Sequence, residues 1–482
     1  MRYVIGVFSV LLILLTIVSI GRAQTAGWSG SGQRYRLPVT FSSGTHELTD
    51  KIAEIPVDFG AAITAVGATG TLNEESIQVT EVSGSTVNDP NVVYQFVKDT
   101  GSTTKGTLMV FAKGITAAGV TRTFHVYFDT VAVTKPALTP VIALTDNVQY
   151  QGHPSYQIAT KNATYMFHKP GGGFAALTDV DGKDWISHNT TAGSAGMYRG
   201  IPNVIEPEGG FHPGDTRLTS QLLVQGPLKV VIASQTTDGL WAGNYEIFPT
   251  YVKFNLTKAA HAYWLLYEGT PGGKLDLDSD YNVRSNGTKS PASASWDADI
   301  PNPEWIYFAD GTMNRSLFMY HLEDDNNTDQ YWPMGNGDMT VFGFGRPSMM
   351  NTIPGHLIFG LMNVRDYDPA KKYIESVNAI ITGTAGTAEK NDNPTTPTIA
   401  VSTPTIAVST PTVGPSNTPP AGCTMKIQGD ANCDDNVKID DFAIWRSEFL
   451  GTLTTKLADF DNNGTVTIAD FARWRTSFLA AP

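Results

Sequence analysis

Hydrophobic and polar residues alternate along much of the first third of the chain, which is the pattern of half-buried β-strands. The first such segment places four large side chains on one face: Tyr35, Leu37, Val39 and Phe41. The same two-residue period recurs in three later segments, 55–59, 108–110 and 124–128. Clusters of Gly, Asn, Ser and Thr separate these segments as turns. We predict that residues 30–134 form a β-sandwich.

Residues 138–384 are rich in aromatic residues, punctuated by glycine and almost free of helical periodicity. They predict one large β domain, so the chain as a whole is expected to be mainly β. Helical spacing of aromatic residues occurs near the carboxyl end, at two sets of positions: Phe442, Trp445 and Phe449, then Phe471, Trp474 and Phe478. We therefore expect a small α-helical domain in which two short helices bury their aromatic faces against each other.

The first 23 residues have the features of a signal peptide. Arg2 precedes an apolar run from Val4 to Ile20, and the small residues Gly21 and Ala23 follow it. We expect cleavage after Ala23 and export to the extracellular medium or the cell surface. The alternative is an uncleaved membrane anchor, because the apolar run is nearly long enough to span a bilayer.

Residues 385–422 predict a linker. The segments 397–403 and 404–410 both have the sequence PTIAVST, and more proline, serine and threonine follow. Such a composition cannot build a packed core and instead favours an extended spacer that can carry O-linked sugars.

A duplicated loop dominates residues 423–482. Oxygen-bearing residues occupy equivalent positions in both copies: Asp430, Asn432, Asp434, Asn436 and Asp441 in the first, and Asp459, Asp461, Asn463, Thr465 and Asp470 in the second. Oxygen ligands at loop positions 1, 3, 5, 7 and 12 are what Ca²⁺ requires. The sequence therefore predicts two bound Ca²⁺ ions.

The duplicated loops and the helix motif after each, at residues 429–479, resemble dockerin modules. This resemblance implies a calcium-dependent partner, a cohesin-bearing scaffold protein. Two features depart from the pattern: Asp435 stands where the first loop of a dockerin has glycine, and neither loop has the hydroxyl pair that helps choose a cohesin. A calcium-stabilised cap or another surface-attachment module is the alternative.

The two cysteines, Cys423 and Cys433, lie at the start of this module. In an exported protein we expect a disulfide between them, which would pin the incoming chain to the first calcium loop. Two free thiols are the alternative.

The central region contains the motif Arg199-Gly200-Ile201-Pro202 and, after a Gly-Phe pair, His212. Together with the order of the predicted strands, this resembles the galactose mutarotase-like β-supersandwich of aldose epimerases and several polysaccharide-active enzymes. The resemblance implies that Arg199 and His212 lie in a saccharide cleft, where epimerases use a histidine as acid and a glutamate as base. Glu268 and Glu246 are candidates for that glutamate.

Three chemistries fit the residues. A lyase of uronic-acid polymers needs a cation, a base and an acid, for which Arg199, His212 and either Tyr198 or Tyr245 are candidates. A glycosidase needs two carboxylates, and four are available: Glu206, Glu268, Glu304 and Asp324. A binding module needs aromatic platforms, and five are available: Trp185, Trp241, Trp264, Tyr331 and Trp332.

Two further residues are candidates for contacting the substrate. Arg346 follows a predicted buried strand and can reach the same cleft. His321 precedes an acidic cluster of Glu323, Asp324, Asp325 and Asp329, which is either a solvated loop or a metal site.

The composition excludes several functions. Acidic residues outnumber basic ones by 46 to 33, a net charge of −13, so nucleic acid is not an expected partner. The central region has no glycine-rich phosphate loop, so no nucleotide cofactor is expected. We predict a secreted modular protein that acts on an acidic polysaccharide as a lyase or hydrolase. The alternative is a non-catalytic glycan-binding or cell-surface assembly protein.

Overall fold

The computed structural model describes residues 27–204, 210–335, 337–391, 428–433, 436–449 and 456–480. The chain divides into two compact units, Met1–Ile399 and Ala400–Pro482. The predicted signal peptide lies outside the described residues, as do most of the predicted linker, Cys423 and Asp434. None of the described helices is both long and apolar enough to cross a membrane. The predicted fold class is confirmed, because β-strands make up most of the regular structure of the first unit and the described part of the second contains two helices.

The amino-terminal domain is a β-sandwich, as the alternating pattern predicts. One sheet contains β1 (Tyr35–Ser42), β7 (Thr121–Asp129), β3 (Asn73–Ser83) and β4 (Thr86–Asp89). The other contains β2 (Leu48–Asp58), β6 (Lys105–Thr116) and β5 (Tyr94–Lys98). The alternating side chains of β1 lie in the core between them. Phe59 differs from the prediction: it begins helix α1 (Phe59–Ala65), because the carboxylate of Asp58 accepts the Ala61 N–H at 2.9 Å and caps the helix.

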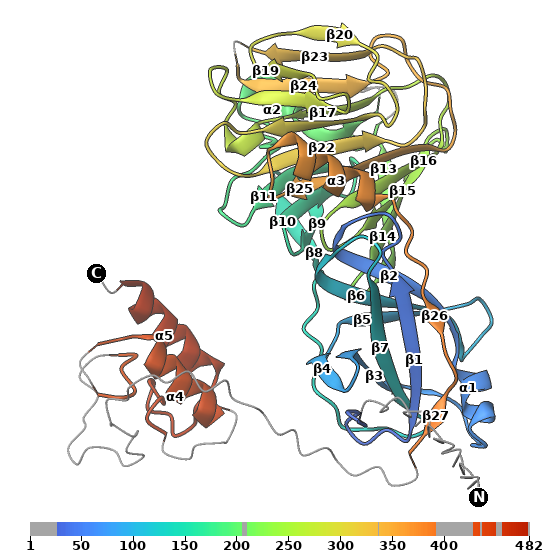
Figure 1. Cartoon of the computed structure of the whole chain (residues 1–482). Helices are drawn as coiled ribbons and strands as arrows, with labels where there is room; N and C mark the ends of the chain where they lie inside the picture. Colours follow the sequence, from blue (N-terminus) through green and yellow to red (C-terminus); the bar gives the residue numbers. More distant parts are fainter. Residues whose placement is uncertain are drawn as a thin grey trace, which may run out of the picture. The chain divides into compact units, whose positions relative to one another are not determined.

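Two late strands complete this sandwich. Strands β26 (Thr384–Ala385) and β27 (Glu389–Lys390) both pair antiparallel with β1, and Figure 1 shows them in orange beside it. The Arg36 Nε donates to the Glu389 carboxylate at 2.9 Å across the second pairing. The sequence placed residues 385–390 in the linker, but here they cover an edge that β1 would otherwise expose. The residues predicted to begin the linker therefore belong to a sheet of the amino-terminal domain.

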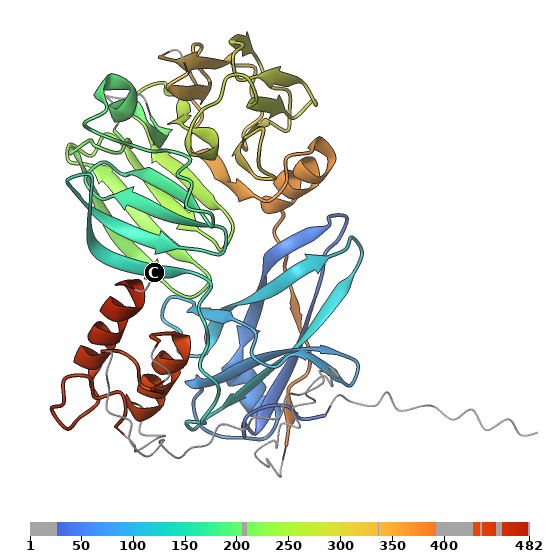
Figure 2. The ribbon, with the colours of Figure 1, turned by 90° about the vertical axis from the view of Figure 1, so that its left-hand side faces the viewer.

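The central domain is a β-supersandwich of two nine-stranded antiparallel sheets. The first sheet has the order β20 (Trp296–Ala298), β23 (Asp329–Met334), β24 (Met339–Phe344), β17 (Leu265–Gly269), β12 (Gly200–Asn203), β11 (Gly173–Asp179), β10 (Ala163–His168), β9 (His153–Ala159) and β8 (Ala143–Tyr150). The second has the order β13 (Leu218–Gln225), β14 (Val230–Thr236), β15 (Ala242–Ile247), β16 (Val252–Lys258), β25 (Gly355–Met362), β22 (Ser316–His321), β21 (Trp305–Ala309), β18 (Tyr281–Arg284) and β19 (Lys289–Pro291). Figure 2 shows the teal strands of the first sheet and the yellow-green strands of the second in separate layers.

Aromatic side chains from both sheets fill the space between them. Phe167 of β10 meets Tyr245 of β15 with ring centroids 5.0 Å apart, and Phe174 of β11 meets Phe359 of β25 at 5.5 Å. Such edge-to-face contacts contribute about 0.5–1.5 kcal/mol each beyond the burial of the rings. Short elements connect the strands: helix α2 (Gly193–Tyr198) and the 3₁₀ turn η1 (Pro271–Gly273). Helix α3 (Tyr367–Val377) packs with the second sheet in a smaller cluster that includes Ile374.

The sandwich and the central domain are in direct contact. Lys51 of β2 donates to the carbonyls of Ser376 and Val377 at 3.0 and 2.6 Å, at the end of α3. Gln95 of β5 accepts the backbone N–H groups of Leu228 and Lys229 at 3.1 and 3.0 Å. These buried hydrogen bonds hold the two domains together within the first unit.

The second unit repeats its structure as it repeats its sequence. Helices α4 (Ile439–Phe449) and α5 (Ile468–Ala480) follow the two loops. Trp445 donates its indole N–H to the Thr467 carbonyl of the second loop at 3.0 Å, and Trp474 donates to the Lys438 carbonyl of the first loop at 3.1 Å. Each helix thus holds the other repeat's loop. The Phe442, Trp445, Phe471 and Trp474 rings pack together as predicted, whereas Phe449 and Phe478 remain exposed.

Candidate functional site

A row of histidines runs along one end of the central domain. The rings of His153 and His168 lie 4.8 Å apart, those of His168 and His188 5.4 Å, and those of His188 and His212 6.2 Å. A cavity of about 530 Å³ adjoins the row and is lined by His188, His212 and Tyr198 among others. Four of the nine histidines of the chain therefore meet here.

Backbone groups fix the orientation of three of these rings. Gly214 donates its N–H to His168 Nδ1 at 3.0 Å. Because a carbonyl only accepts, His188 Nδ1 must donate to the Arg199 carbonyl (3.0 Å), and His212 Nε2 must donate to the Tyr198 carbonyl (2.8 Å). His188 Nε2 then carries a lone pair, and within the described part of the chain this buried atom has no hydrogen-bond partner.

Three histidines of the row, His168, His188 and His212, are neutral at neutral pH. Burial lowers the pKa of His168 to about 3 and that of His188 to about 4, and repulsion from neighbouring histidines adds to both shifts. Burial also lowers the pKa of His212. A neutral imidazole can accept a proton but cannot supply a fixed positive charge.

Glu268 lies beside the end of this row. Its Oε2 accepts the Asn203 side-chain N–H at 2.7 Å and lies 3.9 Å from His212 Nε2. Glu268 also pairs in the sheet with Gly200, directly after Arg199. The fold therefore brings together Arg199, His212 and Glu268, three residues singled out from the sequence, although Arg199 donates to the Ser187 and Asp338 carbonyls at 3.2 and 2.8 Å.

Arg346 belongs to the same region of the sheet. Its guanidinium lies 4.9 Å from the ring centroid of Trp264 and 4.4 Å from that of Trp332. Burial lowers its pKa and the nearby carboxylate of Glu268 partly offsets this. Within the described residues Arg346 makes no hydrogen bond or ion pair, so its N–H donors are available to a ligand.

The pairing of the strands explains why these side chains converge. Glu268 lies opposite Val341, and Val341 lies opposite Trp332, so these side chains share one face of the first sheet. Trp264 and Glu268 share that face by alternation, while Leu265 and Tyr267 point into the core. A Cβ at Gly343 would lie 2.1 Å from Leu266 Cδ2, so glycine leaves the room that Leu266 occupies, and it would also press on Arg346 Cβ at 3.3 Å.

Four predicted site residues lie in the interior instead. Tyr245 is buried on the core face of β15 and donates its hydroxyl to the Gly172 carbonyl. Trp185 is buried and donates its indole N–H to Asp179 at 3.0 Å, and Trp241 is buried as well. His321 is ion-paired with Glu304 and only 1% exposed. None of the four presents a surface to substrate in this conformation, so these predictions are corrected.

His168, His188 and Asn203 were not among the site residues predicted from the sequence. His168 ends β10 just before three glycines, and His188 follows a tryptophan-bearing segment. A polar residue at a strand end beside a glycine run is the signal that could have indicated His168. Tyr198, by contrast, lies at the rim of the cavity and is 44% exposed.

The duplicated loops have matching hydrogen bonds. In the second loop, Asp470 accepts the Asp461 N–H at 3.2 Å and the Thr467 N–H at 2.8 Å. In the first, Asp441 accepts the Asn432 N–H at 3.0 Å and the Lys438 N–H at 2.7 Å. Carboxylate oxygens of Asp459, Asp461 and Asp470 lie within 4.8 Å of one another. This oxygen set fits a hard divalent cation such as Ca²⁺.

The other residues predicted to hold calcium are placed as follows. Asp430 accepts the Cys433 N–H at 2.7 Å, and Asn463 accepts the Thr465 N–H at 2.9 Å. Asn436 is exposed beside the Asp434 position, which lies outside the described residues. Cys433 is disulfide-bonded. Cys423, the other cysteine of the chain, lies outside the described residues.

No protein-family model matches the sequence, and no curated protein matches it. Several solved structures align with the fold. YeaD of Salmonella typhimurium, a candidate mutarotase, is 13% identical with a TM-score of 0.33, and the alignment covers 47% of this chain and 95% of that one. The protein HI1317 is 14% identical with a TM-score of 0.34, and the coverage is 47% and 98%.

A larger protein also aligns. An α-mannosidase from Enterococcus faecalis is 9% identical with a TM-score of 0.39, and the alignment covers 73% of this chain. The chain spans about half the length of that enzyme, 46%.

Proposed function

We propose that the central domain binds and cleaves an acidic polysaccharide, and that Arg346 holds the carboxylate of a uronic-acid unit. One observation carries this proposal: an arginine without a hydrogen-bond partner among the described residues lies between Trp264 and Trp332, near Glu268. Guanidinium groups bind carboxylates through two parallel hydrogen bonds, and tryptophan rings pack against the apolar faces of sugars.

Arg346 suits this role better than Arg199. Two backbone carbonyls occupy the Arg199 guanidinium, at 3.2 and 2.8 Å. Those bonds position the turn between α2 and β12, and a ligand could bind this guanidinium only by replacing them. Arg346 needs no such exchange.

The chemistry proposed for the site is β-elimination. A base removes the C5 proton of the uronate, the electron pair forms the C4–C5 double bond, and the C4–O bond breaks as an acid protonates the leaving oxygen. Arg346 stabilises the negative charge that develops at the carboxylate. Glu268 and the neutral His212, 3.9 Å apart, are the candidate bases, and Tyr198 at the cavity rim is the candidate acid.

The test uses the full chain with a panel of polyuronides. Elimination is measured by the absorbance of unsaturated uronide ends, and hydrolysis by new reducing ends without that absorbance. We expect unsaturated ends. Arg346→Ala should lower kcat/KM about 30–150-fold, because a charge-assisted bidentate contact contributes about 2–3 kcal/mol. Arg346→Lys should recover only part of the loss, because an ammonium cannot form the two-bond contact.

Arg284→Ala is the matched control. Arg284 also lies over a tryptophan, 4.4 Å from the Trp296 centroid, but on β18 of the second sheet. It should keep full activity. Equal activity in wild type, Arg346→Ala and Arg284→Ala would refute the proposed role of Arg346.

A second candidate function is glycan binding without catalysis. The observation that favours it is the hydrogen bond from His212 Nε2 to the Tyr198 carbonyl, because a nitrogen that already carries a proton cannot accept the C5 proton as a base. In that case no polyuronide yields new ends, yet Arg346→Ala weakens binding in affinity electrophoresis while Arg284→Ala does not.

We further propose that the protein is exported and attaches to a scaffold or cell surface through the carboxyl-terminal unit when two Ca²⁺ ions are bound. The carboxylates of Asp459, Asp461 and Asp470 support the second site. Calorimetry should give two ions per chain, with one lost in Asp470→Asn and none lost in the exposed control Asp278→Asn. A cohesin domain should bind in Ca²⁺ and be released by a chelator. Calcium binding without cohesin capture would favour a stabilising cap.

A further inference from the structure

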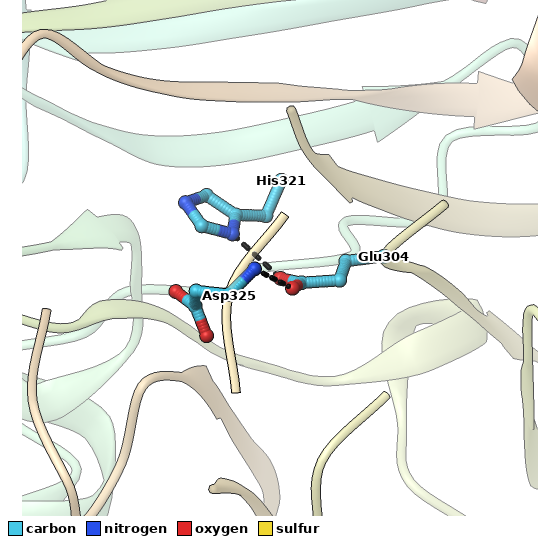
Figure 3. Close-up of side chains that lie close together, drawn as sticks. All are labelled: Glu304, His321 and Asp325. Carbon is cyan, nitrogen blue, oxygen red and sulfur yellow. Dashed lines mark hydrogen bonds and ion pairs between the residues drawn. The ribbon is translucent and has the colours of Figure 1, made fainter. Parts of the chain in front are cut away.

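A second polar cluster lies in the central domain, away from the histidine row. Glu304 directly precedes β21, His321 ends β22, and Asp325 lies in the loop that leads to β23. Figure 3 shows the three side chains together. Strands β21 and β22 pair, and the His321 N–H donates to the Glu304 carbonyl at 2.9 Å, so the backbone holds these two residues side by side.

The three residues are arranged as metal ligands. His321 Nδ1 lies 2.7 Å from Glu304 Oε2, and the Asp325 N–H donates to Glu304 Oε1 at 2.8 Å. One potential ligand atom from each residue lies within 4.8 Å of the other two. Glu304 and His321 are 2% and 1% exposed, whereas Asp325 is half-buried and gives access from solvent.

A fourth carboxylate completes the arrangement. Glu323 Oε2 lies 3.2 Å from His321 Nε2, on the side of the ring opposite Glu304. Glu323 is itself held by His356, whose backbone N–H donates to it at 2.9 Å. Histidines that bind a metal through one nitrogen commonly present the other to a carboxylate, which fixes the tautomer. His321 Nε2 lies close to the Glu323 carboxylate, but the geometry is not that of an aligned hydrogen bond.

The charge of the cluster also favours a cation. Glu304, Glu323 and Asp325 bring three carboxylates around His321 and His356. Buried carboxylates are costly unless opposite charge compensates them. A divalent ion supplies that charge in one place.

We propose that Glu304, His321 and Asp325 bind a divalent transition-metal ion of the Zn²⁺ class, with His321 Nδ1, one oxygen from each carboxylate and one water as ligands. A mixed nitrogen and oxygen set selects such ions over Ca²⁺, which prefers oxygen alone. Binding replaces the proton between His321 Nδ1 and Glu304, and that proton leaves to solvent. The two atoms must then separate from 2.7 Å to about 3 Å or more, as ligands on one tetrahedral ion do.

The test is Co²⁺ binding to the full chain, measured by visible absorbance after chelator treatment and dialysis, with excess Ca²⁺ present to occupy other oxygen sites. Wild type should bind one Co²⁺ with the absorbance of a nitrogen-containing tetrahedral site, and Zn²⁺ should displace it. Asp325→Asn should lose this signal. It keeps the backbone N–H to Glu304, so the buried His321–Glu304 pair remains.

Asp324→Asn is the matched control, because Asp324 is an exposed carboxylate next in sequence and is not a ligand in the proposal. It should bind Co²⁺ like wild type. Glu323→Gln should weaken binding about 10–100-fold without changing the spectrum, as loss of a supporting carboxylate does. The proposal is wrong if wild type shows no such absorbance, or if Asp325→Asn and Asp324→Asn bind equally. Thermal unfolding of each variant checks that it is folded.

Discussion

His188 and His321 are almost equally buried, 2% and 1% exposed, yet His188 is neutral and His321 is protonated at neutral pH. Burial lowers the pKa of His188 to about 4, and its neighbours are other histidines. Burial also opposes protonation of His321, but the carboxylates of Glu304 and Glu323 outweigh it and raise the pKa of His321 to about 9. His188 is therefore neutral, whereas His321 is protonated.

The difference shows that burial alone does not set the character of a polar cluster; the neighbours decide it. A neutral row costs little to bury and can exchange protons with a ligand. An ionised cluster is stable only while each charge has a partner. The predictions below test this contrast in order of expected effect.

The largest effect is expected for His321→Ala. It removes the cation between Glu304 and Glu323, so two carboxylates lose their partner in the interior, and the free energy of unfolding should fall by about 3–5 kcal/mol. His188→Ala removes a neutral ring and one hydrogen bond and should cost about 1–3 kcal/mol. Urea unfolding in the presence of a chelator measures both.

His46→Ala is the control for this pair, because His46 is exposed and should change the free energy by less than about 0.5 kcal/mol. If His188→Ala proves the more costly of the two buried changes, the assigned charge states are wrong.

The next effect is acid sensitivity. The pKa of His188 rises from about 4 in the folded chain to its ordinary value near 6.5 on unfolding, so the unfolded chain binds more protons in that range. Stability is complete above about pH 6.5 and falls by about 1.4 kcal/mol per pH unit for each such histidine as the pH approaches 4. His168, with a pKa lowered to about 3, adds the same trend.

The His321 cluster does not lower the free energy of unfolding between pH 6.5 and 4.5. A pKa of about 9 means that its stabilisation is complete below pH 6.5, and the Glu323 pKa, lowered to about 2, leaves that carboxylate ionised until strong acid. His188→Gln should therefore flatten the stability profile between pH 6.5 and 4.5, measured by urea unfolding at each pH. An unchanged slope would contradict the neutral state of His188.

Gly214→Ala tests how tightly the row is packed. Gly214 has φ +92° and donates to His168, and an added Cβ would lie 3.2 Å from His188 Cε1. Gly182 has φ +79° and nothing within 4 Å of its Cβ position, so Gly182→Ala carries the backbone strain alone. We expect Gly214→Ala to be less stable than Gly182→Ala by about 1 kcal/mol in thermal unfolding. Equal losses would mean that His188 can move aside.

The fold was largely predictable from the sequence because side chains on strands and helices repeat with fixed periods. Those periods located β1, β7, α4 and α5. They could not locate β26 and β27. These short strands pair with β1, which the whole central domain separates from them in the sequence, so no local pattern indicates the pairing.

The site was predictable only in part. A motif resemblance indicated Arg199 and His212, and Glu268 was one of two candidate glutamates; the structure brings all three together. Trp185 was misplaced, and Tyr245 was open between core and site, because a period of two says which residues share a face but not whether that face meets the core or a ligand. His188 carried no signal, because its neighbours in the row come from separate strands and loops.

The smallest effect is expected for His153→Ala, which tests the repulsion within the row. His153 lies 4.8 Å from His168, and electrostatic repulsion from it lowers the pKa of both His168 and His188, although less than burial does. His153→Ala should raise the pKa of His168 and that of His188 slightly. The free energy of unfolding should fall by at most about 0.5 kcal/mol, because His153 is only half-buried. Titration of histidine ring protons by NMR measures the shift, with His46→Ala as the control. Unchanged pKa values in His153→Ala would mean that repulsion from His153 does not contribute and that burial lowers the pKa of His168 and His188 without it.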